Sequence, residues 1–254
     1  MIERVDLLRP WEETMEPFKI VGNLYFVGMH ATSSHLIDTG DGLILIDTGY
    51  LTGLYQVIDS IYRLGYNPRD IKYVVNTHWH WDHAEASQAV AELSGAKNLI
   101  GHYDAEDVKR YFEPDILIKD GDTLSLGNTT IHFMETPGHT KGTISFFFDA
   151  SENGKSYRVG MFGGAGVNTL SRGNYEYDGC VEDYFNSVNR LKKEKVDVFI
   201  GNHVWNNDTV GKGEILRKTG ENKFIDSIAW NEFLDSCEGN LKKVIAEETK
   251  NLQK

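Results

Sequence analysis

Four residues in one short segment carry side chains that bind metal ions: His78, His80, Asp82 and His83. In an extended loop, a spacing of two points the first two imidazoles to the same side. Asp82 and His83 follow where the pattern turns helical, and they add a carboxylate and a third imidazole. Because imidazole and carboxylate are common zinc ligands, the segment predicts a metal site. The weaker alternative is a solvated polar loop.

Two further histidines lie at predicted strand ends and could complete such a site. His139 follows Pro137 and Gly138, and His203 follows the apolar run at 198–200. Ligands from separate strand ends on one face of a sheet can converge on one ion. Three other histidines are expected in structural settings, with the first of them nearest to the cleft: His30, His35 and His132.

The elements that must position these residues alternate between strands and helices. Residues rich in β-branched and aromatic side chains, interrupted by turn signals, predict hairpins at 18–28 and 34–47. Helical spacing of apolar residues predicts a helix at 52–64, and a strand follows at 71–75. The remaining expected elements are a helix at 84–93, a strand at 98–101, a helix at 102–111, a hairpin at 121–135, strands at 144–149 and 156–162, a helix at 180–193, a strand at 196–200, and helix from 214 into a solvated tail at 243–254.

This order predicts one domain over residues 1–254, with two sheets between helical layers. No Pro- or Ser-rich linker divides the chain. The metal motifs lie within 18–203, and 204–254 form a C-terminal helical part that could line the cleft or a dimer face. Whether the protein is a monomer or a homodimer stays open.

Composition excludes several classes of partner. The chain of 254 residues has 26 Lys and Arg against 38 Asp and Glu, a formal charge of −12, so no nucleic-acid-binding surface is expected. No apolar run is long enough to span a membrane. The acidic start has no signal-peptide pattern, which predicts a cytoplasmic protein, or a periplasmic or secreted one if a leader was removed. Two distant cysteines, Cys180 and Cys237, do not suggest a thiolate metal cluster.

The motifs together resemble the metallo-β-lactamase superfamily. They are HWHWDH at 78–83, LIDTG at 45–49, TPGHT at 136–140 and the final His203, in consistent order. The resemblance implies an α/β fold, the four-layer αβ/βα sandwich, with two zinc ions at the sheet edge and iron or manganese as alternatives. It implies that one metal is held by His78, His80 and His139 and the other by Asp82, His83 and His203. Asp47 would brace the ligand loop.

One segment departs from the common pattern of that family. Most of its hydrolases place a metal-bridging Asp after the next strand, whereas residues 161–168 read MFGGAGVN. The chain therefore resembles the third lactamase subclass, whose second metal is held by Asp, His and His. The absence counts against glyoxalase II, the RNA-processing phosphodiesterases and the acyl-homoserine lactonases. Gly164 and Gly166 stand where the third subclass usually has serines that contact the substrate carboxylate.

These observations predict a β-lactamase-like, zinc-dependent hydrolase. A metal-bridging hydroxide would cleave an acyl C–N or C–O bond of a small-molecule substrate, and Asp82 would orient the water. Large aromatic residues of the motif and nearby polar residues are candidates for substrate contact, although core packing explains at least one tryptophan equally well. These candidates are Trp79, Trp81, Asn168, Tyr175, Tyr177, Trp205 and Asn206.

Three other functions are kept as alternatives. A lactonase or thioesterase of the same fold would be expected in the cytoplasm, which agrees with the expected absence of a leader. An iron-dependent oxidoreductase of this fold typically has Glu where His80 stands, and needs a flavin domain for which no residues remain after His203. A non-catalytic binding protein of this fold would be expected to have lost its metal-binding residues, whereas all six are present here.

Overall fold

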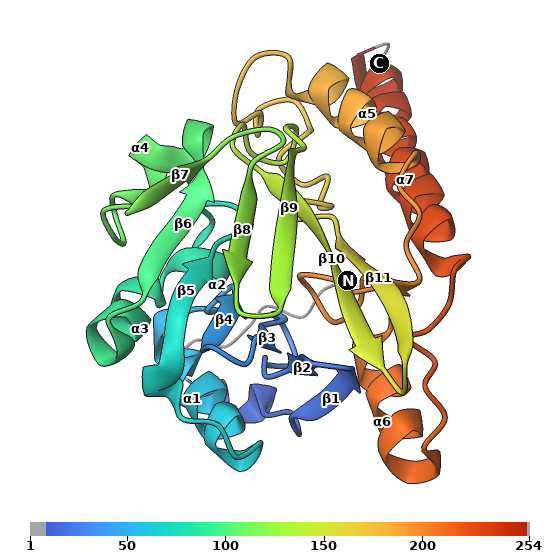
Figure 1. Cartoon of the computed structure of the whole chain (residues 1–254). Helices are drawn as coiled ribbons and strands as arrows, with labels where there is room; N and C mark the ends of the chain where they lie inside the picture. Colours follow the sequence, from blue (N-terminus) through green and yellow to red (C-terminus); the bar gives the residue numbers. More distant parts are fainter. Residues whose placement is uncertain (1–8, 253–254) are drawn as a thin grey trace.

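The structure is a computed structural model that describes residues 9–252. The first eight residues, on which part of the expectation about a leader rests, lie outside the described residues, as do residues 253–254 of the expected tail. Its strands form two sheets (Figure 1). The seven-stranded sheet has the order β1 (Phe18–Val21), β2 (Leu24–Phe26), β3 (His35–Asp38), β4 (Leu43–Ile46), β5 (Ile71–Val75), β6 (Lys97–Gly101) and β7 (Ile116–Ile118).

The second sheet has five strands and lies against the first. Its order is β12 (Val198–Phe199), β11 (Lys155–Met161), β10 (Ile144–Glu152), β9 (Thr129–Glu135) and β8 (Thr123–Leu126). Neighbouring strands are antiparallel except from β4 to β7 and between β11 and β12, where they are parallel. The helices are α1 (Leu54–Arg63), α2 (Trp81–Ala84), α3 (Ser87–Ser94), α4 (Ala105–Val108), α5 (Cys180–Leu191), α6 (Thr209–Thr219) and α7 (Ala229–Leu252).

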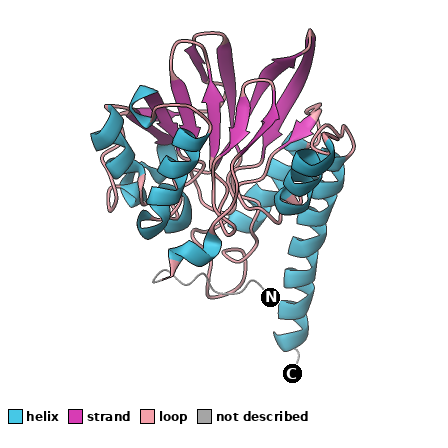
Figure 2. Ribbon diagram, turned by 90° about the horizontal axis from the view of Figure 1, so that it is seen from below, coloured by secondary structure: helices cyan, strands magenta, loops and turns pink. Residues whose placement is uncertain are grey.

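The alternation of side chains along buried strands produces four layers. In β10, Phe146 and Phe148 enter the apolar core between the two sheets, while Phe147 packs with residues of α5 and α7 on the other face. In β4, Ile44 and Ile46 face the second sheet, and the intervening leucine packs under α1. Strands buried on both faces are expected to be apolar throughout, as these are. Figure 2 shows the helices on the two outer sides of the sheets, which confirms the αβ/βα sandwich.

Most expected elements are present, but several differ from the sequence prediction. The helix expected at 84–93 is broken: α2 ends at Ala84 and α3 begins at Ser87. The break lets Glu85 accept a hydrogen bond from the Leu51 N–H at 2.9 Å, and lets the Ala86 N–H donate to Gly49. Tertiary hydrogen bonds to the loop at 48–51 therefore override local helix preference.

Other differences are at element ends. The helix expected at 102–111 is one 3₁₀ turn, His102–Asp104, followed by the short α4, because Asp104 turns inward to accept a hydrogen bond from Gly142. The C-terminal helix expected from 214 begins earlier, at Thr209, and is interrupted at 220–228. Asp208 caps that first helix by accepting from the Gly211 N–H. The edge strand β7 was not predicted.

Within residues 9–252, none of the helices combines the length and the apolar composition needed to cross a bilayer.

Candidate metal centre

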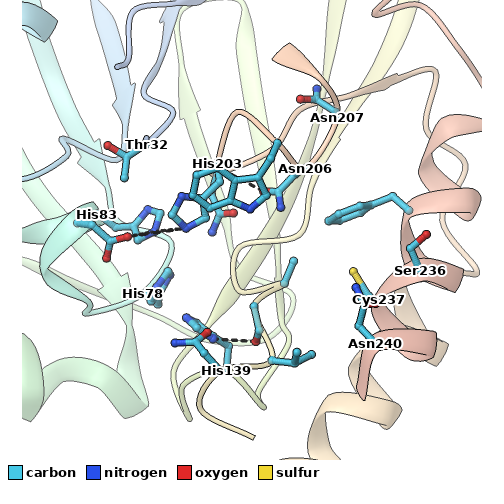
Figure 3. A pocket seen from close by; sticks show the side chains of 18 of the residues that line it. Thr32, His78, His83, His139, His203, Asn206, Asn207, Ser236, Cys237 and Asn240 are labelled. Atoms are coloured by element: carbon cyan, nitrogen blue, oxygen red, sulfur yellow. Dashed lines mark hydrogen bonds and ion pairs between the residues drawn. The ribbon is translucent and has the colours of Figure 1, made fainter. Parts of the chain in front are cut away.

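The candidate ligands lie where strands of both sheets end at one edge of the sandwich. In the first sheet β4 and β5 are parallel, so Asp47, which follows β4, lies beside the segment from 76 to 83 that follows β5. The Asp47 N–H donates to Val75 O at 2.9 Å. His139 comes from the loop after β9 and His203 from the loop after β12. Figure 3 shows the imidazoles of these separate elements gathered at one side of a cleft.

The first group of converging side chains, the first triad, consists of His78, His80 and His139. One nitrogen of each lies within 4.8 Å of the others. His80 Nδ1 is 3.0 Å from His139 Nε2. His78 Nε2 is buried and has no hydrogen-bond partner among the described residues. Such a nitrogen is costly to bury unless something else binds it.

The second triad consists of Asp82, His83 and His203, whose ligand atoms also lie within 4.8 Å of one another. The Nε2 atoms of the two histidines are 3.3 Å apart. Asp82 Oδ2 lies 3.5 Å from His83 Nε2 and 3.7 Å from His203 Nε2. The ring of His83 is 4.3 Å from that of His78, centroid to centroid, so the two triads adjoin.

Buried hydrogen bonds fix the orientation of two ligand rings through Asp47. This residue accepts from the Thr77 N–H at 2.7 Å and from the Thr77 hydroxyl at 2.8 Å. His83 Nδ1 donates to the same carboxylate at 2.8 Å. Because the Thr77 hydroxyl donates to Asp47, it accepts from His78 Nδ1 at 3.1 Å. Asp47 thus links the Thr77 backbone to the ring of His83 and lies behind the two triads.

Backbone carbonyls orient two other rings. His139 Nδ1 donates to Gly166 O, and His203 Nδ1 donates to Ala31 O, both at 2.9 Å. In His80 the outward nitrogen is Nε2, and its partner is Glu176 at 3.1 Å. In all five histidines, therefore, one nitrogen has an outward hydrogen-bond acceptor and the other faces the centre. Histidines that bind metals are held in this way.

At neutral pH, the protonation states of most of these side chains suit the binding of a cation. Burial, and then the neighbouring histidines, lower the pKa of His139 to about 3. Burial is also the main cause that lowers the pKa of His203 to about 4 and that of His78 well below its usual value. Burial alone would raise the pKa of Asp82, but the adjacent histidines outweigh it and lower that pKa. His83 differs, because Asp82 and Asp47 raise its pKa against the effect of burial.

When the imidazoles are neutral, the inward nitrogens of His80 and His139, and those of His83 and His203, direct their lone pairs toward each other, and a cation between them relieves the repulsion. Neutral imidazoles and an ionised carboxylate are the form in which these side chains bind zinc. The residues present therefore fit the two-metal site that the motifs imply.

The triads form one wall of a cleft of about 1430 Å³. Trp81 and Trp205 line it and are 39% and 46% exposed, and the Trp205 ring stacks on His203 at 4.3 Å. Asn168 and Asn206 line it as well. Trp79 packs instead on a small apolar cluster, with the Arg110 guanidinium 4.4 Å above its ring. Tyr175 and Tyr177 are not among the described residues that line the cleft.

Sequence reasoning missed two acidic residues beside the ligand loop. Glu176 contacts His80, as described above, and lines the cleft. Asp104 is buried and accepts from the Trp79 N–H at 3.1 Å and the Thr140 hydroxyl at 2.7 Å. Burial, the largest influence, raises the pKa of Asp104 to about 6. A single acid in a polar loop has no spacing signal that could have identified either residue.

The other histidines belong to neither triad and are not among the described residues that line the cleft. His30 and His132 are exposed, whereas His35 is buried in β3. Burial lowers the pKa of His35 to about 3. His102, which the sequence analysis did not consider, pairs with Glu135 Oε1 at 2.7 Å.

Comparison with known proteins agrees with the fold and the ligand pattern. Residues 27–152 match the model of the metallo-beta-lactamase superfamily. The subclass B3 metallo-beta-lactamase BJP-1 of Bradyrhizobium japonicum superposes with a TM-score of 0.89 at 28% identity, over 96% of this chain and 99% of that one. The native FEZ-1 metallo-beta-lactamase of Legionella gormanii superposes with a TM-score of 0.88 at 28% identity, over 93% and 98%.

A curated relative that is not named as a lactamase matches part of the chain. The hydroxyacylglutathione hydrolase of Hyphomonas neptunium is 35% identical over 123 residues, which are 48% of this chain and 44% of that protein. The chain thus spans about half the length of the curated relatives it matches. The chain belongs to the metallo-beta-lactamase superfamily, and its fold is that of the subclass B3 enzymes, the third subclass.

Proposed function

We propose that the protein is a metal-dependent hydrolase that cleaves an acyl C–N or C–O bond of a small-molecule substrate. The observation that carries this proposal is the convergence of the two triads, with one nitrogen of every histidine directed inward. Two bound zinc ions would supply Lewis acidity toward a carbonyl oxygen and lower the pKa of water to about 7.

The ligand residues have distinct tasks in this proposal. His78, His80 and His139 would hold one zinc ion, and Asp82, His83 and His203 would hold the other. Asp82 is the proposed catalytic residue, because its carboxylate lies at the centre and can accept a proton from water and orient it. Trp205, stacked on His203, shields one side of the reacting atoms from bulk water.

We further propose that residues 18–203 and the helical part at 204–254 act as one domain. Trp230 of α7 supports this, because its ring packs against Phe147 and Phe199 of the second sheet, with centroids 6.0 and 5.5 Å away.

Hydrolysis of a thioester is the second candidate. It is favoured by the name of the curated hydrolases that match the chain, and by the glycines at 164 and 166, which offer no side chain to a substrate carboxylate. The structural neighbours favour a β-lactam.

A substrate panel tests the proposal. Protein loaded with zinc, stripped with a chelator and reloaded would be assayed on a chromogenic cephalosporin, a lactone and a thioester. We expect turnover that is lost on stripping, restored by zinc, and reduced at least about 10³-fold by His78→Ala. His132→Ala changes an exposed histidine of β9 and should keep full activity. Equal turnover by stripped protein or by His78→Ala would disprove the proposal.

A further inference from the structure

The cleft does not end at the triads but continues to α7. Its far wall is formed by one face of this helix, which includes Phe233, Ser236 and Cys237. Figure 3 shows Ser236, Cys237 and Asn240 across the cleft from the histidines. A volume of about 1430 Å³ exceeds the roughly 300–1,000 Å³ of most small-molecule sites. The space beyond the reacting atoms can therefore hold a substantial part of a substrate.

Apolar side chains line the part of the cleft between the triads and α7. Phe233 packs against Phe199, with ring centroids 4.4 Å apart, and both line the cleft. Ala165 and Val167 border it from the loop that carries the carbonyl partner of His139. An extended apolar group placed there would be removed from water on both sides, which favours binding in proportion to its length.

At Gly164 and Gly166, the loop between the two walls is too closely packed to take a serine that could bind a carboxylate. A Cβ atom on Gly164 would lie 2.7 Å from Thr143 Cγ2 and 2.9 Å from His139 Cβ. A Cβ atom on Gly166 would lie 2.8 Å from Asn168 Oδ1 and 3.1 Å from His139 Cε1. A serine at either position would have to displace the ligand His139 or its neighbours.

The charges of the cleft also disfavour an anionic substrate tail. Among the described residues that line it, Lys212 is the one lysine or arginine. Two carboxylates of the same lining, Asp208 and Asp226, act on the Lys212 ammonium group, and Glu232 is exposed on α7. A carboxylate far from the triads would meet more negative than positive charge.

We propose that the cleft selects an uncharged, apolar acyl substrate whose body extends from the two triads to Phe233 on α7. This inference rests on the proposed function, because it assigns a substrate class to the same site.

The test is direct binding of three hydroxamic acids to the zinc-loaded protein, measured by calorimetry. Acetohydroxamic acid has no tail, octanohydroxamic acid has a neutral eight-carbon chain, and suberic monohydroxamic acid has the same length with a terminal carboxylate. We expect the octanoyl compound to bind at least about tenfold more tightly than each of the others. Its methylene groups are buried in the cleft, and binding does not require the burial of a charge. Equal affinity of the three, or tightest binding of the carboxylate compound, would overturn the proposal.

Two variants locate the subsite. Phe233→Ala should remove most of the gain from chain length and leave the affinity for acetohydroxamic acid unchanged. The matched control is Phe185→Ala, which removes a ring that packs on the same apolar cluster but does not line the cleft. If both variants lose the gain equally, the subsite lies elsewhere.

An exposed position gives a variant that does not depend on core packing. Glu232→Lys should tighten binding of the suberic compound by at least about threefold and leave the octanoyl compound unchanged.

Failure of this inference differs from failure of the proposed function. Hydrolysis of acyl substrates without any preference for a neutral chain would refute the inference alone. The expected binding order without turnover of any substrate would refute the hydrolase function alone.

Discussion

Two walls face each other across the metal centre, and they are built in different ways. The ligand wall, residues 47–48 and 76–87, is held by buried polar contacts. Ser87, for example, donates to Asn76 at 2.6 Å and lies 3.0 Å from the Thr48 hydroxyl. The cover, residues 163–179, 204–208 and α7, is held mainly by apolar contacts and exposes Trp205.

This difference separates two requirements of the protein. Ligand atoms must be placed within a fraction of an ångström, and a dense hydrogen-bond network provides that placement. A substrate surface needs shape and low polarity, which many apolar side chains can supply. The ligand wall is therefore expected to determine metal binding, and the cover to determine stability of the helical layer and choice of substrate.

The largest expected effect comes from the cover. Trp230 is fully buried, and its indole N–H donates to Leu191 O at 3.1 Å. Trp230→Ala should lower the free energy of unfolding by about 3–5 kcal/mol, measured by urea denaturation. Zinc affinity, measured where the variant remains folded, should stay within about twofold. Asn231→Ala, at the exposed neighbouring position, should change neither. A large loss of zinc affinity in Trp230→Ala would erase the distinction between the walls.

The next effect comes from the ligand wall. Asp47 has a φ of 51°, a left-handed conformation that Asn also tolerates, so Asp47→Asn changes the charge without straining the backbone. The amide keeps one acceptor but loses the charge that holds His83. We expect zinc affinity at the second triad to fall about 10- to 100-fold in chelator competition.

Asp59→Asn serves as the control for the loss of a carboxylate. This residue lies on α1, where its carboxylate is solvent-exposed. Unchanged zinc affinity in Asp47→Asn would show that the buried network does not control metal binding.

The smallest effect is expected where the two walls meet. Glu176, which belongs to the cover, is the outward partner of His80, and both side chains are partly exposed. Solvent screens this contact, so Glu176→Gln should weaken metal binding only roughly threefold to tenfold, at the first triad alone. The absorption spectrum of the cobalt-substituted protein should change, because the His80 ring is less constrained. Glu182→Gln, exposed on α5, should leave the spectrum unaltered. An effect as large as that of Asp47→Asn would place Glu176 functionally in the ligand wall.

The sequence predicted the ligand wall better than the cover, for physical reasons. His78, His80, Asp82 and His83 form one local pattern, so their chemistry is visible without a fold. The convergence of His139 and His203 on the ligand loop was predicted because each residue follows a strand. In the structure, His139 lies in the first triad and His203 in the second. Strands with alternating or continuous apolar residues were located within a few positions, including β5 at its observed ends.

What could not be predicted depends on contacts between distant segments. The break between α2 and α3 exists because residues 85–86 bond to the loop at 48–51. The role of Glu176 depends on a loop that returns to His80 from 96 positions away. The face that α7 presents to the cleft depends on how Trp230 seats the helix on the second sheet. None of these contacts leaves a periodic signal in the sequence.

The stacking of Trp205 on His203 has a practical consequence for spectroscopy. The two rings are 4.3 Å apart and nearly parallel, at 11°. An indole in van der Waals contact with a ligand imidazole senses the electronic state of whatever that imidazole binds. A paramagnetic ion in the second triad should quench Trp205 emission, while zinc should leave it bright. The molecule thus carries its own optical probe of metal binding, placed against a ligand of the second triad.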